Sequence, residues 1–142
     1  MAAFVIATYN RGVPLIYNGQ EIALSYPLLF PFTEQKIAWS PNQPVTDEYA
    51  KLIRFYNCST AIRCGMPTSH SSGDVSAFVK ESGNDKALVL VNIRNRMVRF
   101  NLPGALANST WYGGFDGRET KLGVALDLAP YQYLAFTAAP LN

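Results

Sequence analysis

The sequence of 142 residues is poor in charge and in the residue types that bind nucleic acids or anionic membranes. Asp, Glu, Lys and Arg make up 15% of it, below the usual quarter, and the formal net charge is +2. Charges this sparse and scattered do not build the strongly basic surface that such partners require. We therefore expect neither a nucleic-acid partner nor a membrane partner.

Histidine and cysteine are also scarce. His70 is the single histidine and lies among serines, where a solvated loop residue is the favoured interpretation. Cys58 and Cys64 are six residues apart in one predicted helix, so they fall on different faces and are poor candidates for a disulfide with each other. Without a CxxC motif, the sequence predicts no metal site and no cofactor.

Long hydrophobic runs are missing as well. The first seven residues lack a basic leader region, and their apolar run is too short to span a bilayer. Neither a signal peptide nor a transmembrane segment is expected in this chain, and the compartment of any longer parent stays open. The hydrophobic content of 49% is nevertheless ample for a packed core.

A short apolar run near the N-terminus organises the first part of the chain. Residues 2–10 predict a helix that stops at Gly12, and Val13–Tyr17 then read as a buried parallel strand with Pro14 at its start. Polar residues follow directly, at the carboxyl end of the strand, where ligands bind in α/β folds. The candidate rim residues are Asn18, Gly19, Gln20 and Glu21.

A proline-rich stretch and a helix complete this part. Residues 22–45 contain four prolines and several aromatics, which favours an irregular segment packed on the surface. Apolar residues then recur every three or four positions from Tyr49 to Tyr56, which predicts one helix running from Thr46 to Gly65.

Beyond residue 67 the pattern changes from helical to strand-like. Residues 68–73 are polar and read as a linker or domain junction, and from Val75 onward apolar residues alternate with polar ones. Strands are expected at 75–79, 87–93, 97–102, 110–115, 124–128 and 131–137. The predicted organisation is a mixed α/β segment at 1–66 and an antiparallel Greek-key β-sandwich at 67–142.

Four segments of the sequence are similar to one enzyme family. The run G-V-P-L-I-Y-N-G-Q-E-I at 12–22 resembles the eighth-strand motif G-x-P-x-I-Y-x-G-x-E of α-amylase-type enzymes, glycoside hydrolase family 13. Residues 37–40 resemble the family's I-D-W segment, with Ala38 in place of the aspartate, and 49–65 its last barrel helix. Residues 75–137 resemble the β-sandwich that follows the barrel.

The resemblance implies a function for a longer parent and a supporting role for this chain. It implies that 1–66 is the C-terminal end of a catalytic (β/α)8 barrel, in a retaining glycosidase acting on α-glucans such as starch and maltooligosaccharides. The family's catalytic carboxylates follow the fourth, fifth and seventh barrel strands, all before Met1. We therefore expect no catalytic residue here. For Glu21, a structural role at the barrel mouth is favoured over substrate contact.

Two other functions stay open. In a carbohydrate-binding module, sugar rings would stack on exposed aromatic side chains, although the favoured alternative is that these residues fill the sandwich core. The candidates are Trp111, Tyr112 and Tyr131, with Phe115 and Tyr133 nearby. In a structural or interaction domain, apolar surface that lacks its neighbours would drive self-association. If the chain is instead part of a longer glycosidase, the expected partner is the N-terminal part of the barrel.

Overall fold

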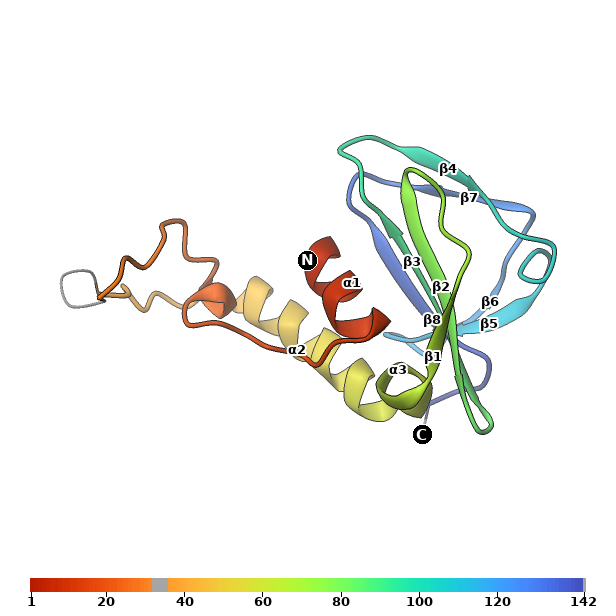
Figure 1. The fold of residues 1–142 in the computed structure, drawn as a ribbon, viewed down its shortest axis with the longest axis horizontal. Helices are drawn as coiled ribbons and strands as arrows, with labels where there is room; N and C mark the ends of the chain where they lie inside the picture. The colour runs from red at the N-terminus through yellow and green to blue at the C-terminus, as the bar shows by residue number, and fades with distance from the viewer. Residues whose placement is uncertain (32–35, 142) are drawn as a thin grey trace.

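The structure, a computed structural model, describes residues 1–31 and 36–141. In this part of the chain, three α-helices and one short 3₁₀ turn precede eight β-strands (Figure 1). The helical segments are α1 (Ala2–Asn10), η1 (Gln20–Ile22), α2 (Gln43–Cys58) and α3 (Thr60–Cys64). The strands are β1 (Met66–Ser69), β2 (Val75–Ser82), β3 (Asp85–Asn92), β4 (Val98–Asn101), β5 (Thr110–Gly113), β6 (Glu119–Lys121), β7 (Ala125–Leu128) and β8 (Tyr133–Thr137).

The strands form two antiparallel sheets of unequal size. Six of them lie in the order β1–β2–β3–β8–β5–β6, and β4 pairs with β7 in a second sheet. The pair β4–β7 packs on one face of the larger sheet, as the alternating apolar residues predict. The core between the two sheets includes Val75, Leu88, Leu90, Phe100, Trp111, Leu128 and Phe136.

The helices cover the opposite face of the larger sheet (Figure 1). Because β3 is covered on both sides, Ala87 to Asn92 are all buried, as expected of a strand in a central layer. The phenol of Tyr9 in α1 donates a hydrogen bond to the carbonyl of Leu52 in α2 (2.7 Å). The core on this side includes Val5, Tyr9, Leu52, Phe55, Ile62, Phe78, Val89 and Ala135.

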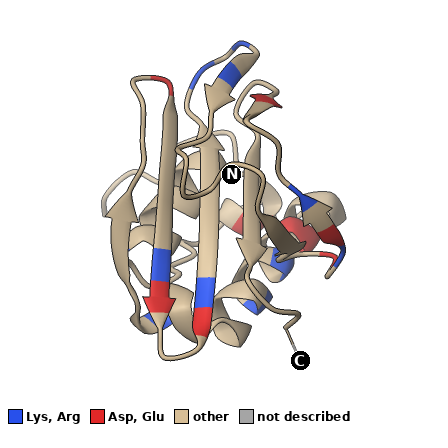
Figure 2. Ribbon diagram, turned by 90° about the vertical axis from the view of Figure 1, so that its right-hand side faces the viewer, with Lys and Arg blue, Asp and Glu red and all other residues tan. Residues whose placement is uncertain are grey.

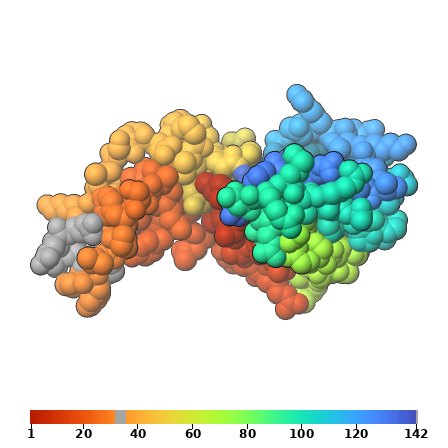
Figure 3. Space-filling view, turned by 90° about the horizontal axis from the view of Figure 1, so that it is seen from above, coloured from red at the N-terminus to blue at the C-terminus, as the bar shows by residue number. Residues whose placement is uncertain are grey.

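In the long strands β2 and β3, charged residues lie toward one end, where the two strands are joined (Figure 2). Seen from above, residues 20–31 and 36–42 project away from the sheets, while the strands form a rounded mass with α1 against it (Figure 3). The described chain therefore combines sheets covered by helices on one face with an N-terminal segment that extends away from them.

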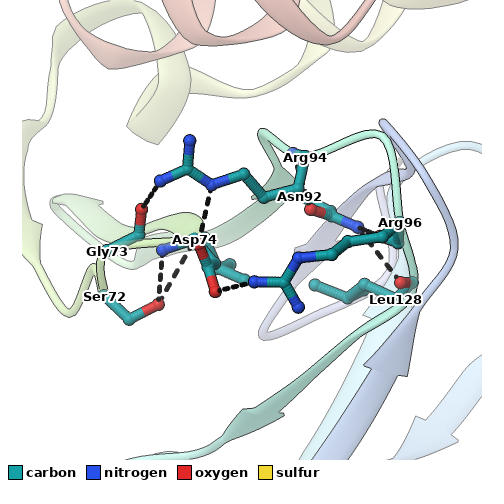
Figure 4. A network of polar contacts seen from close by, with 8 residues as sticks. Ser72, Gly73, Asp74, Asn92, Arg94, Arg96 and Leu128 are labelled. Carbon is teal, nitrogen blue, oxygen red and sulfur yellow. Dashed lines mark hydrogen bonds and ion pairs between the residues drawn. The ribbon is translucent and has the colours of Figure 1, made fainter.

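A polar network ties together the loops at one end of the sheets (Figure 4). Asn92 is fully buried, and its amide donates to the carbonyl of Leu128 at 3.2 Å, so it links the end of β3 to the end of β7. Asp74 accepts hydrogen bonds from Arg94 (2.6 Å) and Arg96 (2.7 Å). These bonds fix the β3–β4 loop against the start of β2.

The predicted buried strand Val13–Tyr17 is not formed. Residues 12–17 have no strand assignment, and Val13 and Leu15 are 75% and 77% exposed. A strand covered on both faces needs neighbours on both sides, and no other strand of the described chain lies beside this segment. The barrel remnant is therefore not confirmed by the fold of this chain.

The predicted single helix from Thr46 to Gly65 is two helices with a break at Ser59. The backbone of Ser59 is extended (φ −94°, ψ 115°), and its hydroxyl accepts from the N–H of Ile62 as an N-cap. The Asp85 carboxylate on β3 accepts from both the Ser59 hydroxyl (2.9 Å) and the Ala61 N–H (2.7 Å). A contact from the sheet thus starts α3 as a separate helix.

The predicted linker at 68–73 begins inside an edge strand. In β1, Met66 pairs with Glu81 and Ser69 with Phe78, and Pro67 is tolerated because the strand lies at the sheet edge. The serines that suggested a loose linker bond back to the chain, since the Ser71 hydroxyl accepts from the N–H of Ala77 (3.0 Å). The short strand β6 was also not predicted.

Candidate functional site

The predicted rim residues form a tight turn that leads into η1. Gly19 has a φ of 90°, in the left-handed region that glycine adopts without strain. A Cβ at this position would lie 2.9 Å from the side chain of Leu24. The N–H of Tyr17 donates to the side-chain oxygen of Gln20 (2.7 Å), while Asn18 is exposed at the start of the turn. The turn is therefore fixed by its own residues.

Glu21 faces the start of α2. Its carbonyl accepts from the Thr46 hydroxyl (2.9 Å), and the amide of Asn42 donates to the carbonyl of Ile22 (3.4 Å). The Oε2 atom of Glu21 is buried and has no hydrogen-bond partner among the described residues. Burial and, second, this carboxylate raise the pKa of Tyr49. A buried acceptor without a donor is suited to a donor supplied from outside the described chain.

The three aromatic candidates for sugar stacking lie apart. Trp111 is only 4% exposed and belongs to the core between the two sheets, where its indole N–H donates to the Ser109 hydroxyl (2.8 Å). Tyr112 is half-buried and pairs with Thr137 at the end of β8. Tyr131 is 51% exposed and lies beyond the other end of β8, a strand roughly 13 Å long.

These positions do not bring the three aromatic side chains into one platform. Trp111 has the core position that the favoured alternative expects. That Tyr112 or Tyr131 binds a sugar ring by itself stays a prediction.

The sequence did not point to one cavity that the structure contains. It has a volume of about 480 Å³ and lies between α2 and the turn that joins β5 to β6. One wall carries the charged side chains of Asp47, Lys51 and Arg54, and the opposite wall is main chain at Gly113 and Gly114. The signal available in the sequence was the polar face of α2, whose residues recur every three or four positions opposite the apolar stripe.

Lys51 and Phe115 line this cavity, and the buried ring of Phe55 lies behind them. The rings of Phe55 and Phe115 meet edge to face, with centroids 5.5 Å apart. The Lys51 ammonium lies 4.9 Å from the centroid of Phe115 and 2.7 Å from the Glu48 carboxylate. Lys51 is therefore held in place by a cation–π contact and an ion pair.

Comparison with known proteins gives one curated relative and several similar folds. No protein-family model matches the chain. The chain is 30% identical over 108 residues to alpha-amylase 2 of Dictyoglomus thermophilum, an alignment that covers 66% of this chain and 18% of that protein. The structure of an Anoxybacillus alpha-amylase matches 99% of this chain and 32% of its own length, with a TM-score of 0.81 and 16% identity.

A maltogenic amylase from S. marinus matches 99% of this chain and 19% of its own length, with a TM-score of 0.78 and 19% identity. The chain corresponds to the C-terminal part of an α-amylase-type protein. This confirms the family resemblance. The α-amylase-type chain spans less than a third of the Anoxybacillus structure and less than a fifth of the curated relative.

The remaining reactive side chains of the α-amylase-type chain do not gather into a site. Cys58 and Cys64 are free and exposed, at the ends of two helices rather than in one. The main-chain N–H of His70 donates to the carbonyl of Ala77 (2.8 Å). Residues 1–31 and 36–141 contain no group of three potential metal ligands. Within the same residues, no helix combines the length and hydrophobicity needed to cross a bilayer.

Proposed function

We propose that this chain is the C-terminal portion of a glycosidase that acts on α-glucans such as starch and maltooligosaccharides. In this proposal, residues 1–66 complete the catalytic barrel and 67–142 form the β domain that braces it. The proposal is supported by similarity to alpha-amylase 2 over 108 residues and by the eighth-strand motif at 12–22. The catalytic carboxylates belong to the part of the protein before Met1.

The exposed segment before η1 supports the proposal that another part of the protein packs against it. Val13, Leu15 and Tyr17 are 75%, 77% and 54% exposed, although their sequence is that of a buried strand. Clusters of exposed large apolar side chains mark surfaces that another part of a protein covers. In this proposal, the N-terminal part of the barrel covers these three side chains. It would also supply a hydrogen-bond donor to the buried Oε2 of Glu21, which follows them in the sequence.

The bracing role is supported by contacts between the helices and the sheet. Buried residues of α1, α2 and α3 share one core with Phe78 and Val89 of the sheet. The ammonium of Lys80 on β2 donates to the carbonyl of Ile62 in α3 (2.5 Å). Such contacts let the β domain hold the last barrel helix in a fixed orientation.

Two measurements test this function. The DNA immediately before the Met1 codon is expected to encode, in frame, barrel strands that carry aspartate and glutamate residues. The isolated chain is expected to release no sugar from maltoheptaose and no nitrophenol from a nitrophenyl maltoside above a buffer blank. Hydrolysis by the isolated chain that disappears in Glu21→Gln would show that the chain has its own catalytic carboxylate and would refute the bracing role.

Self-association is the second candidate, and the exposure of Val13 and Leu15 favours it. Light scattering after size exclusion would detect a dimer or larger assembly of the isolated chain. If the apolar surface causes it, Val13→Ser with Leu15→Ser is expected to return a monomer. A monomeric wild-type chain at high concentration would exclude this candidate.

A further inference from the structure

The turn that joins β7 to β8 holds an aromatic residue in a backbone conformation that aromatic residues rarely adopt. In this turn, at 129–132, the N–H of Gln132 donates to the carbonyl of Ala129 (3.0 Å). Pro130 occupies the second position and Tyr131, with a φ of 54°, the third. These are the features of a type II turn, which usually has glycine or asparagine at the third position. The backbone of Tyr131 is therefore strained where that of a glycine would not be.

The contacts of Tyr131 within the chain do not account for this choice of residue. Tyr131 is 51% exposed and belongs to neither hydrophobic core. Its hydroxyl group makes no hydrogen bond within the described chain. Strained backbone that the surrounding structure keeps in place is concentrated where a residue serves a function. Tyr131 is therefore a candidate for a contact with another molecule.

Hydrogen bonds from both sides keep this turn rigid. The N–H of Tyr131 donates to the carbonyl of Arg94 (3.1 Å), and the N–H of Ala129 donates to the side-chain oxygen of Gln132 (2.8 Å). The buried amide of Asn92 also donates to the carbonyl of Ala129 (2.8 Å). A partner that binds a loop already fixed in this way has little conformational entropy to overcome.

Two further exposed apolar residues lie on the adjoining loop. The N–H of Asn92 donates to the carbonyl of Gln132 (2.8 Å), which places Ile93 opposite Tyr131. Met97 directly precedes β4, whose first residue pairs with the last residue of β7. Ile93 and Met97 are 40% and 67% exposed. Three exposed apolar residues thus lie at the same end of the sheets.

Two arginines accompany these apolar residues, and Figure 4 shows both guanidinium groups turned toward Asp74. Arg94 donates through Nε to Asp74 (2.6 Å) and through Nη2 to the carbonyl of Gly73 (2.7 Å). The guanidinium group of Arg96 contacts the described chain only through Nη2, which donates to Asp74 (2.7 Å). Its Nε and Nη1 are therefore left for an acceptor from outside.

The charges of these loops indicate the class of partner. Residues 69–74, 92–97 and 129–132 contain two arginines and one aspartate, and no other Asp, Glu, Lys or Arg. One positive charge remains after Asp74 is paired, which favours a partner that carries a carboxylate. Tyrosine, methionine and arginine are also the residue types enriched in protein–protein interfaces. The surface that we call the loop patch consists of Ile93, Arg94, Arg96, Met97 and Tyr131.

We propose that the loop patch binds an acidic segment of another protein, in which a carboxylate lies close to an apolar side chain. The carboxylate pairs with the free N–H groups of Arg96, and the apolar side chain packs on Tyr131 and Met97. This inference goes beyond the proposed function and does not depend on it, because the loop patch is built from the strand-connecting loops of the described chain alone.

An NMR titration of the isotope-labelled chain with three blocked tetrapeptides tests the chemistry of the partner. Acetyl-Glu-Leu-Phe-Glu-amide is expected to shift the amide signals of Ile93, Arg94 and Tyr131 with a Kd on the order of 1 mM. Acetyl-Lys-Leu-Phe-Lys-amide reverses the charge, and acetyl-Glu-Gly-Gly-Glu-amide lacks the apolar side chains. Each of these two is expected to bind at least about threefold more weakly.

Each peptide can overturn one part of the proposal. Equal binding of the lysine peptide would refute the acidic partner, and equal binding of the glycine peptide would refute the apolar contact. No shift with the first peptide would refute the site.

The variant Tyr131→Asn tests the strained residue itself. Asparagine adopts a positive φ more readily than tyrosine does, so the urea concentration at the midpoint of unfolding is expected to stay the same or rise. The affinity for the acidic peptide is expected to fall at least about threefold. A lower midpoint with unchanged affinity would show that Tyr131 serves the fold and would refute its role in binding.

Two arginine variants separate a specific contact from general attraction between charges. Arg118 is exposed in the β5–β6 turn, at the other end of β8, so Arg118→Gln is the matched control for Arg96→Gln. Arg96→Gln is expected to weaken binding of the acidic peptide at least about threefold, and Arg118→Gln to bind as the wild type does. Equal losses would refute the site. A dimer of the chain that Tyr131→Asn dissociates would assign the loop patch to a second copy and refute the proposed partner.

Discussion

Replacing Lys80 with methionine is expected to lower the free energy of unfolding by about 2–4 kcal/mol, because Lys80 links two helices to the sheet. Its side chain is 2% exposed. The ammonium group donates to the carbonyl of Tyr9 in α1 (3.1 Å) and to that of Ile62 in α3 (2.5 Å). Both carbonyls belong to the last turn of a helix, where no N–H of the same helix can reach them.

The magnitude follows from what the substitution leaves behind. Methionine keeps most of the side-chain volume, so it creates little cavity, but it cannot donate to either carbonyl. Leaving a buried acceptor unpaired costs about 1–3 kcal/mol for each group. The two carbonyls together would cost about 2–6 kcal/mol. Part of this cost is recovered because a buried ammonium group no longer has to be desolvated, so we expect a total in the lower half of that range.

Urea unfolding followed by circular dichroism measures this effect, with Lys86→Met as the control. Lys86 lies on the neighbouring strand β3 and forms an exposed ion pair with Glu81 (2.8 Å), so its removal is expected to cost about 0–1 kcal/mol. Hydrogen exchange in Lys80→Met is expected to be faster in the last turn of α1. Equal stability of the two variants would refute the role assigned to Lys80.

The pH dependence provides a further check on Lys80. Burial lowers the pKa of Lys80 from the ordinary 10.5. Between the lowered pKa and 10.5 the unfolded chain binds more protons at this residue than the folded chain does, so the contribution of Lys80 makes stability rise with pH in this window. Lys80→Met is expected to abolish that rise, measured below the ordinary phenol pKa of 10.0 so that tyrosines do not interfere.

Three further predictions concern a close approach, a buried phenol and a surface network. Gly114→Ala would place a Cβ 2.4 Å from the ring of Phe55 in α2 and is expected to lower the free energy of unfolding in urea by about 1–3 kcal/mol. Gly73 has open space around it, so Gly73→Ala should change that free energy by less than about 0.5 kcal/mol. Equal losses in the two variants would contradict this prediction. Burial and, second, the charge of a nearby glutamate raise the pKa of Tyr9, so stability should fall above pH 10.0 as only the unfolded phenol ionises. Tyr9→Phe is expected to lose about 0.5–1.5 kcal/mol and to reduce that fall in a pH series of thermal melts. A hydrogen bond from Arg94 and the charges of Arg94 and Arg96 lower the pKa of Asp74 from 3.8, so stability should be lost as pH falls below 3.8. Asp74→Asn should reduce this loss when the free energy of unfolding is measured at decreasing pH. An unchanged loss would contradict the role of the network.

Local patterns in the sequence were sufficient to predict α1 and most of the strands. The helix at 2–10 and the alternation from Val75 onward depend on short-range spacing, and both are confirmed. The break at Ser59 was not predictable in the same way, because it depends on the Asp85 carboxylate, which is 26 residues further along the chain. The cavity beside Arg54 likewise requires the β5–β6 turn to fold against α2, and no local pattern shows that contact.

The strand predicted at Val13–Tyr17 shows a different limit. Its near-continuous apolar sequence is typical of a strand buried on both faces. In the described chain, no neighbouring strand buries it. The motif at 12–22 predicts the correct family but the wrong local structure, because a motif can identify relatives even where no neighbouring strand pairs with it. Under the proposed function, the exposed side chain of Leu15 is one place where the N-terminal part of the barrel would pack.

The helices and the sheet depend on one another for burial. The boundary predicted after residue 66 separates two patterns of sequence, but Phe55 on one side of it and Phe78 and Val89 on the other belong to a single core. Fully burying one such side chain contributes about 1.5–3 kcal/mol, so either half alone would lose several times this amount. Lys80 adds polar contacts across the same boundary. A β domain joined to the last helices in this way can orient them without touching a substrate, which is why a bracing role needs no catalytic residue in this chain.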